Sequence, residues 1–372
     1  MIAKCIEYAF TKEGMLKLDE VRPGVKKSKK NVDSQSNGRA EGIGNNGDAH
    51  APSQSCNSPS FSWTGVIDAV ELAHTTRGLG FHFGRDTPIP IHRRPLHRST
   101  FLKATFRSFL IHFLELDILD TILKLFPGVG LPSGGSMFYP TLTFPLRLLV
   151  STTIHILTGS ALVAGFNMVY DLITFFAVGL LNSSPQNWPP VMDDPWHADS
   201  MHRFWSKDWH QLLRRTFLIY GGYPARYLSR CVSTLLFRGF GVFSAKSSTR
   251  QVKITRILED VASVFGIFLA SGLWHECTMY AMGRGFEWAA IVFFIGQAAL
   301  LIGERLWKKL TGRKVAGLWG RVWVYLVIFI GPQMMGEQPI FFFFLKWSPD
   351  VFNQWILGID VGWVGVWSYH LL

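Results

Sequence analysis

The sequence predicts an all-α integral membrane protein, a polytopic chain with about six to eight membrane-embedded helices around a buried tunnel. Of its 372 residues, 48% are hydrophobic and 17% are charged, whereas about 25% of the residues of an average soluble domain are charged. Several apolar segments approach the ~20 residues that a helix needs to cross the hydrocarbon core of a bilayer. No stretch shows the alternation of apolar and polar residues that is typical of strands.

The first sixty residues differ from the rest in composition. Residues 31–60 contain no Leu, Met or aromatic residue, and Gly, Ser, Asn and Pro dominate. Such a segment buries too little apolar surface to offset the entropy lost on ordering, so we expect it to be disordered. Residues 1–30 carry a basic cluster and lack the apolar core of a signal peptide. We therefore expect two parts, a basic and disordered region over 1–60 and a membrane domain over 61–372.

The apolar segments follow in the second part. The predicted spans, each near the length that a bilayer requires, are 160–181, 257–281, 288–303, 322–345 and 351–372. Residues 141–159 form a weaker span. Residues 101–126 are long enough but carry six charges, which favours either an interfacial helix or a span buried among others. Pro332 and Pro339 predict a broken or tilted helix in the run that they interrupt.

Basic residues predict the orientation of these spans. Every charged residue between Trp209 and Leu258 is Lys or Arg, and a second basic loop, "ERLWKKLTGRK", begins at Glu304. The positive-inside rule places both regions on the cytoplasmic side. Residues 257–281 then lead out and residues 288–303 lead back. We expect the membrane to be that of the endoplasmic reticulum.

Two ionisable residues interrupt the most apolar part of the chain, in "SGLWHE" within "VASVFGIFLASGLWHECTMYA". Ser271 and Gly272 precede His275 by four and three residues and share its helix face, which predicts an opening for a ligand beside the imidazole. At about 1.5 Å per residue, His275 lies roughly 20 Å from the cytoplasmic end of the segment. The alternative is tight packing of helices with an interhelical hydrogen bond. Glu276 points about 100° away, which favours an interhelical partner.

A second cluster of histidines and tryptophans lies upstream, in "DPWHADSMHRFWSKDWHQLLRRTF" over 194–217. Asp194 and Pro195 predict the N-cap and first turn of an amphipathic helix. Its predicted faces carry Trp205, Trp209, Leu212 and Thr216 on one side, and Arg203, Ser206, His210 and Arg214 on the neighbouring one. An interfacial helix with tryptophans at the level of the lipid headgroups is the alternative.

These two motifs together resemble the membrane-bound O-acyltransferase superfamily, in particular its wax-synthase-like branch in fungi. "FWSKDWHQLLRR" precedes the intramembrane "SGLWHE", and "RGLGFHF" (77–83) and "RRPL" (93–96) resemble the upstream part of that branch. The resemblance extends over residues 63–345. It implies a polytopic helical enzyme that transfers an acyl group from acyl-CoA to a hydroxyl group of a lipophilic acceptor.

The resemblance also implies the residues that carry this reaction. His275 matches the catalytic histidine of the family, and His210 matches a position that holds asparagine or histidine near the reaction centre. A buried neutral imidazole can take the proton of an alcohol as the oxygen attacks the thioester. The predicted supports for substrate and oxyanion are Trp205, Trp209, Ser271 and Gly272. The candidates for binding the CoA phosphates are Arg214, Arg215, Arg226 and Arg230.

Fungal relatives in this branch often acetylate terpenoid or meroterpenoid alcohols, so the resemblance favours acetyl-CoA as co-substrate and no permanently bound cofactor. The alternative within the same class is wax ester synthesis from long-chain acyl-CoA and fatty alcohols. The alternative of another class is a membrane transporter or scaffold in which His275, Glu276 and Asp171 line a pathway. The expected partners are the lipophilic alcohol, acyl-CoA and the lipid bilayer, and the sequence sets no oligomeric state.

Other site classes are not expected. The net charge of +11 comes with no nucleic-acid-binding motif, so no nucleic acid is predicted as a partner. The upstream histidines do not share a predicted helix face and "HEC" is not HExxH, so we expect no metal. The four cysteines are scattered and form no CxxC pair, which predicts neither a disulfide framework nor a zinc site.

Overall fold

The structure is a computed structural model that describes residues 7, 15–18, 63, 66, 69, 71–72, 75–129, 138–239, 248–281, 286 and 288–331. These residues fall into two compact units, one within Met1–Asp86 and one within Thr87–Leu372. Over this described part, helices are the only regular elements apart from one isolated bridge between Lys17 and Phe81. The all-α prediction is therefore confirmed.

The first unit contains the "RGLG" part of the predicted upstream motif. Gly78 has a φ of +71°, and a Cβ there would lie 2.5 Å from the ring of Phe83. Both the backbone conformation and the lack of space therefore require glycine at this position. The following residues form a short 3₁₀ turn over His82–Gly84. Phe81 is buried beside Lys17, whose amine donates to Glu71 at 2.9 Å.

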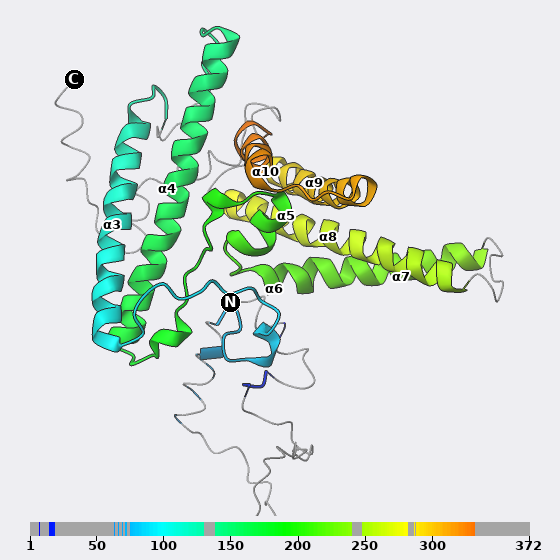
Figure 1. Cartoon of the computed structure of the whole chain (residues 1–372), viewed down its shortest axis with the longest axis horizontal. Helices are drawn as coiled ribbons and strands as arrows, with labels where there is room; N and C mark the ends of the chain where they lie inside the picture. The colour runs from blue at the N-terminus through cyan, green and yellow to red at the C-terminus, as the bar shows by residue number, and fades with distance from the viewer. Residues whose placement is uncertain are drawn as a thin grey trace, which may run out of the picture. The chain divides into compact units, whose positions relative to one another are not determined.

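The second unit begins with two long helices, α3 (Arg98–Lys124) and α4 (Phe144–Gly179), which run side by side (Figure 1). The structure corrects the prediction of two separate spans at 141–159 and 160–181, because α4 is one helix of 36 residues. Pro145 lies in the first turn of α4, where its missing N–H costs nothing, and no later proline interrupts it. At about 1.5 Å per residue, α4 is roughly 54 Å long.

Three further long helices follow, α7 (Tyr223–Gly239), α8 (Ser248–Ala281) and α9 (Ala289–Thr311). Helix α8 packs along both α7 and α9 (Figure 1). By length and composition, α4, α8 and α9 are the helices of the described part that can cross a membrane. The spans predicted at 257–281 and 288–303 are therefore found as helices, but α8 begins at Ser248 and α9 continues to Thr311, so most of the loop predicted from Glu304 is helical.

The remaining predicted spans have a different outcome. Helix α10 (Gly317–Tyr325) and a π-helical turn over Leu326–Ile330 occupy the start of the span predicted at 322–345. Pro332, Pro339 and the span predicted at 351–372 lie outside the described residues. Helix α3 exposes many large hydrophobic side chains, but its charges keep it out of the set of membrane-crossing helices.

The prediction of one amphipathic helix over 194–217 is wrong, because the chain there forms a series of short turns. A 3₁₀ turn over Pro195–His197 is followed by α5 (Met201–Arg203), a π-helical turn over Phe204–Asp208, α6 (Arg214–Phe217) and a second π-helical turn over Leu218–Gly222. Asp194 has a left-handed backbone with a φ of 58°, so it does not start a continuous helix. Ser200 is the N-cap instead, and its hydroxyl accepts the Arg203 N–H at 3.2 Å. Trp209 is extended, so the helical faces assigned to this segment do not exist.

The turns over residues 194–222 are called the winding segment below. The core of the second unit joins the winding segment to the long helices. Its buried hydrophobic residues come from the segment itself, from α8, from α9 and from the region of α10. Glycines allow two close backbone contacts. A Cβ at Gly320 would lie 2.0 Å from the Asp199 carbonyl oxygen, and a Cβ at Gly221 would lie 2.0 Å from that of Gly266 on α8. The chain on both sides of His210 is therefore fixed against long helices.

Candidate active site

His275 lies on α8, and its local hydrogen bond determines which ring nitrogen is basic. Its Nδ1 lies 2.7 Å from the backbone carbonyl oxygen of Ser271. Because a carbonyl can only accept, Nδ1 carries the proton in the neutral imidazole and Nε2 keeps a free lone pair. The ring is half-buried and packs against Phe294 of α9, with 4.6 Å between ring centroids. This arrangement presents a base in an apolar setting.

His210 lies in the turn that follows the first π-helical turn. Its ring packs against Phe166 of α4 at 4.9 Å and against Trp209 at 5.3 Å. Its Nδ1 is buried and has no hydrogen-bond partner among the described residues. Burial, with a smaller contribution from repulsion by His275, lowers the pKa of His210 to about 4. His210 is therefore neutral at physiological pH.

The structure brings the two histidines together although they lie far apart in the sequence. A series of ring contacts leads from one to the other, because His275 packs against Phe294 at 4.6 Å and His210 packs against Trp209 at 5.3 Å. Trp205 connects their surroundings, because its ring lies 6.3 Å from Trp209 and 5.9 Å from Phe294. The two imidazoles thus share an apolar aromatic enclosure. No group of three His, Cys, Asp or Glu side chains that could hold a metal occurs over the described ranges.

The four residues predicted to support the substrate and the oxyanion have different surroundings in the structure. The Trp205 indole N–H donates to Gln297 Oε1 at 3.2 Å, so it is already engaged. The Trp209 indole N–H makes no hydrogen bond to another residue of the described chain. Ser271 is buried and accepts the hydrogen bond from His275 through its backbone.

Gly272 does not border an opening. A Cβ there would lie 2.7 Å from the Cα of Ile291, so Gly272 lets α8 and α9 approach closely. The open face that its small size predicts is filled by α9, and the tight-packing alternative describes this position. Glu276 is also an interhelical contact, as expected, because its carboxylate accepts the Trp288 N–H at 2.9 Å at the start of α9.

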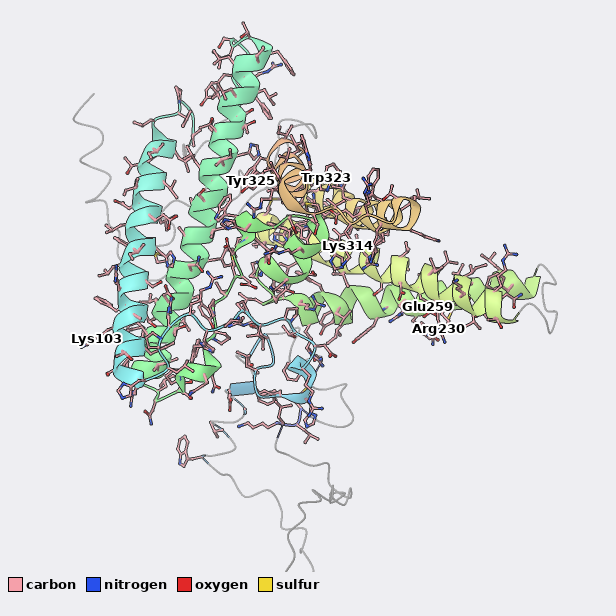
Figure 2. The ribbon with its side chains drawn as sticks, in the orientation of Figure 1. Lys103, Arg230, Glu259, Lys314, Trp323 and Tyr325 are labelled. Carbon is pink, nitrogen blue, oxygen red and sulfur yellow. The ribbon has the colours of Figure 1, made fainter. Side chains whose placement is uncertain are left out.

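The predicted CoA-binding arginines divide into two pairs. Arg230 donates to Glu259 at 2.7 and 3.1 Å, and both residues are labelled in Figure 2. Arg226 donates to Asp260 at 2.5 Å, so acidic residues of α8 partly neutralise both arginines. Arg214 donates to the Ser206 carbonyl and to Gln211, close to His210. Arg215 follows it in α6. Arg214 and Arg215 therefore lie nearer to His210 in the chain than Arg226 and Arg230 do.

The "RRPL" motif has a structural explanation. Arg94 donates to Asp171 of α4 at 2.5 Å and to two hydroxyl groups of α3. Asp171 is 2% exposed and also contacts His112 Nδ1 at 3.1 Å. This ion pair ties the segment before α3 to the two helices, and it gives Asp171 a partner inside the protein.

Three polar residues that the sequence analysis did not single out shape the site. Gln211 donates to the carbonyl oxygens of Trp205 and Trp209, at 3.2 and 2.7 Å, and closes the turn that carries His210. Gln297 and Glu304 of α9 bind the preceding part of the segment. Gln297 is the only strongly polar residue in the run "AAIVFFIGQAALLIG", a signal that could have identified it.

Comparisons with known proteins found one family and several fungal relatives. Residues 188–296 match the model of the membrane bound O-acyl transferase family, and this range contains both histidines. The chain is 27% identical to acetyltransferase eriL of Hericium erinaceus, over 74% of this chain and 67% of that protein. It is 26% identical to O-Mevalon transferase yanI of Aspergillus niger and 27% identical to acetyltransferase atnC of Arthrinium sp.

The chain spans about half the length of the last two relatives, 51% and 47% respectively. No solved structure matches it. The family match and these fungal relatives agree with the motifs around the two histidines. Over residues 188–296 the chain is thus similar to the membrane bound O-acyl transferase family, and it is similar to fungal proteins that are named acetyltransferases.

Proposed function

We propose that this protein transfers an acetyl group from acetyl-CoA to a hydroxyl group of a lipophilic acceptor, a terpenoid-type secondary metabolite. The observation that carries the proposal is that two imidazoles from separate segments lie at the ends of one series of contacting aromatic rings, Trp209, Trp205 and Phe294. One of them, His275, has its Nδ1–H engaged by a backbone carbonyl, which leaves Nε2 as the base. Transfer of an acyl group from a thioester to an alcohol needs such a base, because an alcohol is a weak nucleophile at neutral pH.

The reaction then proceeds in balanced steps. Nε2 of His275 takes the hydroxyl proton as the alcohol oxygen attacks the thioester carbonyl, and the carbonyl oxygen becomes an oxyanion. The C–S bond breaks as the oxyanion collapses, and the leaving thiolate of CoA receives the proton. The products are an ester and free CoA. Ser271 holds the imidazole in the required tautomer through its backbone.

The oxyanion needs a hydrogen-bond donor in a setting that excludes water. His210 and the Trp209 indole are the donors that the geometry favours, because the Trp205 indole is engaged by Gln297. For the CoA phosphates we retain Arg214 and Arg215, which follow His210 by four and five residues and whose guanidinium groups suit phosphate. Arg226 and Arg230 bind carboxylates of α8.

The rings around His275 support a short acyl group. Phe294 is 5% exposed and lies against the imidazole of His275. The rings of Phe268 and Trp205 pack in turn against Phe294, at 6.5 and 5.9 Å between ring centroids. A long acyl chain beside Nε2 would have to displace these rings. Two of the relatives are themselves named acetyltransferases.

Phe294→Ala is expected to relax the preference for acetyl transfer. Removal of the ring opens space beside His275, so the rate with hexanoyl-CoA relative to acetyl-CoA should rise by about tenfold, the scale of discrimination in an apolar pocket. The measurement is the ratio of initial ester-forming rates with the two donors. Phe293→Ala is the matched control, because Phe293 is similarly buried on the same helix and does not stack on His275. Equal ratios in the two variants would contradict the assignment of Phe294.

The topology belongs to the same proposal. We infer an endoplasmic reticulum membrane with residues 209–258 and 304–314 on the cytoplasmic side, where acyl-CoA is found. We also retain the division of the chain into a basic N-terminal region over 1–60 and an acyltransferase domain over 61–372.

Thiol labelling checks this topology. In a background with the four native cysteines replaced by Ser, Thr249→Cys and Thr311→Cys should react with an impermeant maleimide added outside sealed microsomes. Both threonines are exposed, so burial within the protein does not protect them. Protection of either site until detergent is added would overturn the orientation.

One experiment separates the candidate functions. Membranes that contain the protein are incubated with acetyl-CoA or palmitoyl-CoA and a panel of terpenoid and fatty alcohols, and esters are measured by mass spectrometry. We expect acetyl esters of terpenoid alcohols. Palmitoyl esters of fatty alcohols would instead identify a wax synthase. Absence of any ester would favour the transporter or scaffold alternative.

A further inference from the structure

A buried carboxylate on helix α9 binds the segment that carries His210. Glu304 is 9% exposed, and it accepts the backbone N–H groups of Met201 at 2.7 Å and His202 at 2.9 Å. It also accepts the Trp323 indole N–H at 3.0 Å. The two backbone N–H groups belong to the first two residues of α5, where a backbone N–H has no acceptor within the helix. The carboxylate therefore satisfies three donors from two separate parts of the chain.

The same face of α9 reaches the histidines two turns earlier. Gln297 is 3% exposed and accepts the Trp205 indole N–H at 3.2 Å. One turn before it, Phe294 stacks on His275. Residues three and four apart share a helix face, so one stripe of α9 contacts both the segment before His210 and the ring of His275.

Helix α10 closes the other side of this arrangement. Trp323 contacts Glu304, and the Tyr325 hydroxyl donates to the Trp196 carbonyl oxygen at 2.7 Å; both side chains are labelled in Figure 2. The Gly317 N–H donates to the Asp199 carboxylate at 3.2 Å. The start of the segment is thus bound by two helices at once.

We propose that Glu304 and Gln297 are positioning residues that set His210 against His275 for acyl transfer. This inference rests on the proposed function. Neither residue touches the reacting atoms in this scheme; Glu304 acts through α5, and Gln297 acts through Trp205. Gln211 transmits the position of Trp205 to the turn of His210, because it binds the carbonyl oxygens of Trp205 and Trp209. A misplacement of about 1 Å at a reaction centre costs roughly 100-fold in rate.

Kinetics of Glu304 variants form the first part of the test. Glu304→Leu should lower kcat by about 100-fold while KM for acetyl-CoA stays within about threefold, because the loss is one of geometry and not of binding. Glu304→Gln should retain more activity, since one amide oxygen still accepts. Glu115→Leu is the matched control, because Glu115 is an exposed acid of α3. Wild-type kcat in Glu304→Leu would overturn the proposal.

A double-mutant cycle tests the contact between Gln297 and Trp205. Trp205→Phe removes the indole N–H, and Gln297→Leu removes its acceptor. If Gln297 acts through this bond, the double variant should lose no more kcat than the more affected single variant. Losses that simply multiply would overturn the role assigned to Gln297.

A readout that needs no enzymatic activity keeps this inference separate from the proposed function. Met201 is 0% exposed, so in a background with the native cysteines replaced by Ser, the thiol of Met201→Cys should resist N-ethylmaleimide. Adding Glu304→Leu should release α5 and increase the labelling rate at least about tenfold, while adding Glu115→Leu should not. An unchanged rate would overturn the proposal. If the wild-type protein makes no ester, the proposed function fails, and this labelling still decides whether Glu304 holds the segment.

Discussion

His275→Ala is expected to abolish ester formation while the protein still inserts into the membrane. In the proposed reaction this imidazole is the base, because the hydrogen bond from Nδ1 to the Ser271 carbonyl leaves Nε2 free. A general base contributes about 10²–10⁴-fold to a rate, so less than about 1% of wild-type turnover should remain. The measurement is the initial rate of acetyl ester formation in microsomes at equal protein level.

His155→Ala is the matched control for this variant. His155 lies on α4, is 1% exposed, and its Nδ1 contacts the carbonyl oxygen of Ser151 four residues earlier, at 3.0 Å. It therefore repeats the local hydrogen bond of His275 at a place outside the proposed reaction. This variant should lower the yield of folded protein and leave the turnover of that protein close to wild type. More than a tenth of wild-type turnover in His275→Ala would count against the base.

Sequence patterns that depend on neighbouring residues predicted helices α8 and α9, but they missed α7. The apolar lengths of α8 and α9 and the position of His275 within α8 follow from local composition. The division of α4 into two spans was wrong because length alone does not set a boundary. Nothing between the two predicted spans stops a helix, since a proline occurs only in the first turn of α4.

The winding segment before His210 was not predictable in the same way. A helical pattern of tryptophans and basic residues indicated one amphipathic helix, but the segment is held by contacts from distant residues. Glu304 binds its start and Gln297 binds Trp205, more than ninety residues away in each case. These buried donors and acceptors favour the turns over a continuous helix, because they satisfy backbone groups that the turns leave open.

Residue type alone also left two site assignments ambiguous. Gly272 is compatible with an opening or with a close helix contact, and only the position of Ile291 decides between them. Arg226 and Arg230 suit phosphate binding until Glu259 is found beside them. In both cases the deciding partner lies on another helix.

His210→Leu is expected to lose about 10²–10³-fold in kcat, the scale measured when one oxyanion donor is removed. His210→Asn should keep part of the activity, because an amide N–H can donate in place of the ring N–H. Burial lowers the pKa of His210 to about 4, so the ring stays neutral above about pH 5 and its role should not vary from pH 5.5 to 8. Initial rates of ester formation at equal protein level, over this pH range, provide the measurement. His197→Leu is the matched control, because the His197 side chain is 58% exposed in the same segment. If His210 were only part of an aromatic contact with Phe166 and Trp209, the Leu variant would turn over as fast as the Asn variant, and that result would refute the donor role.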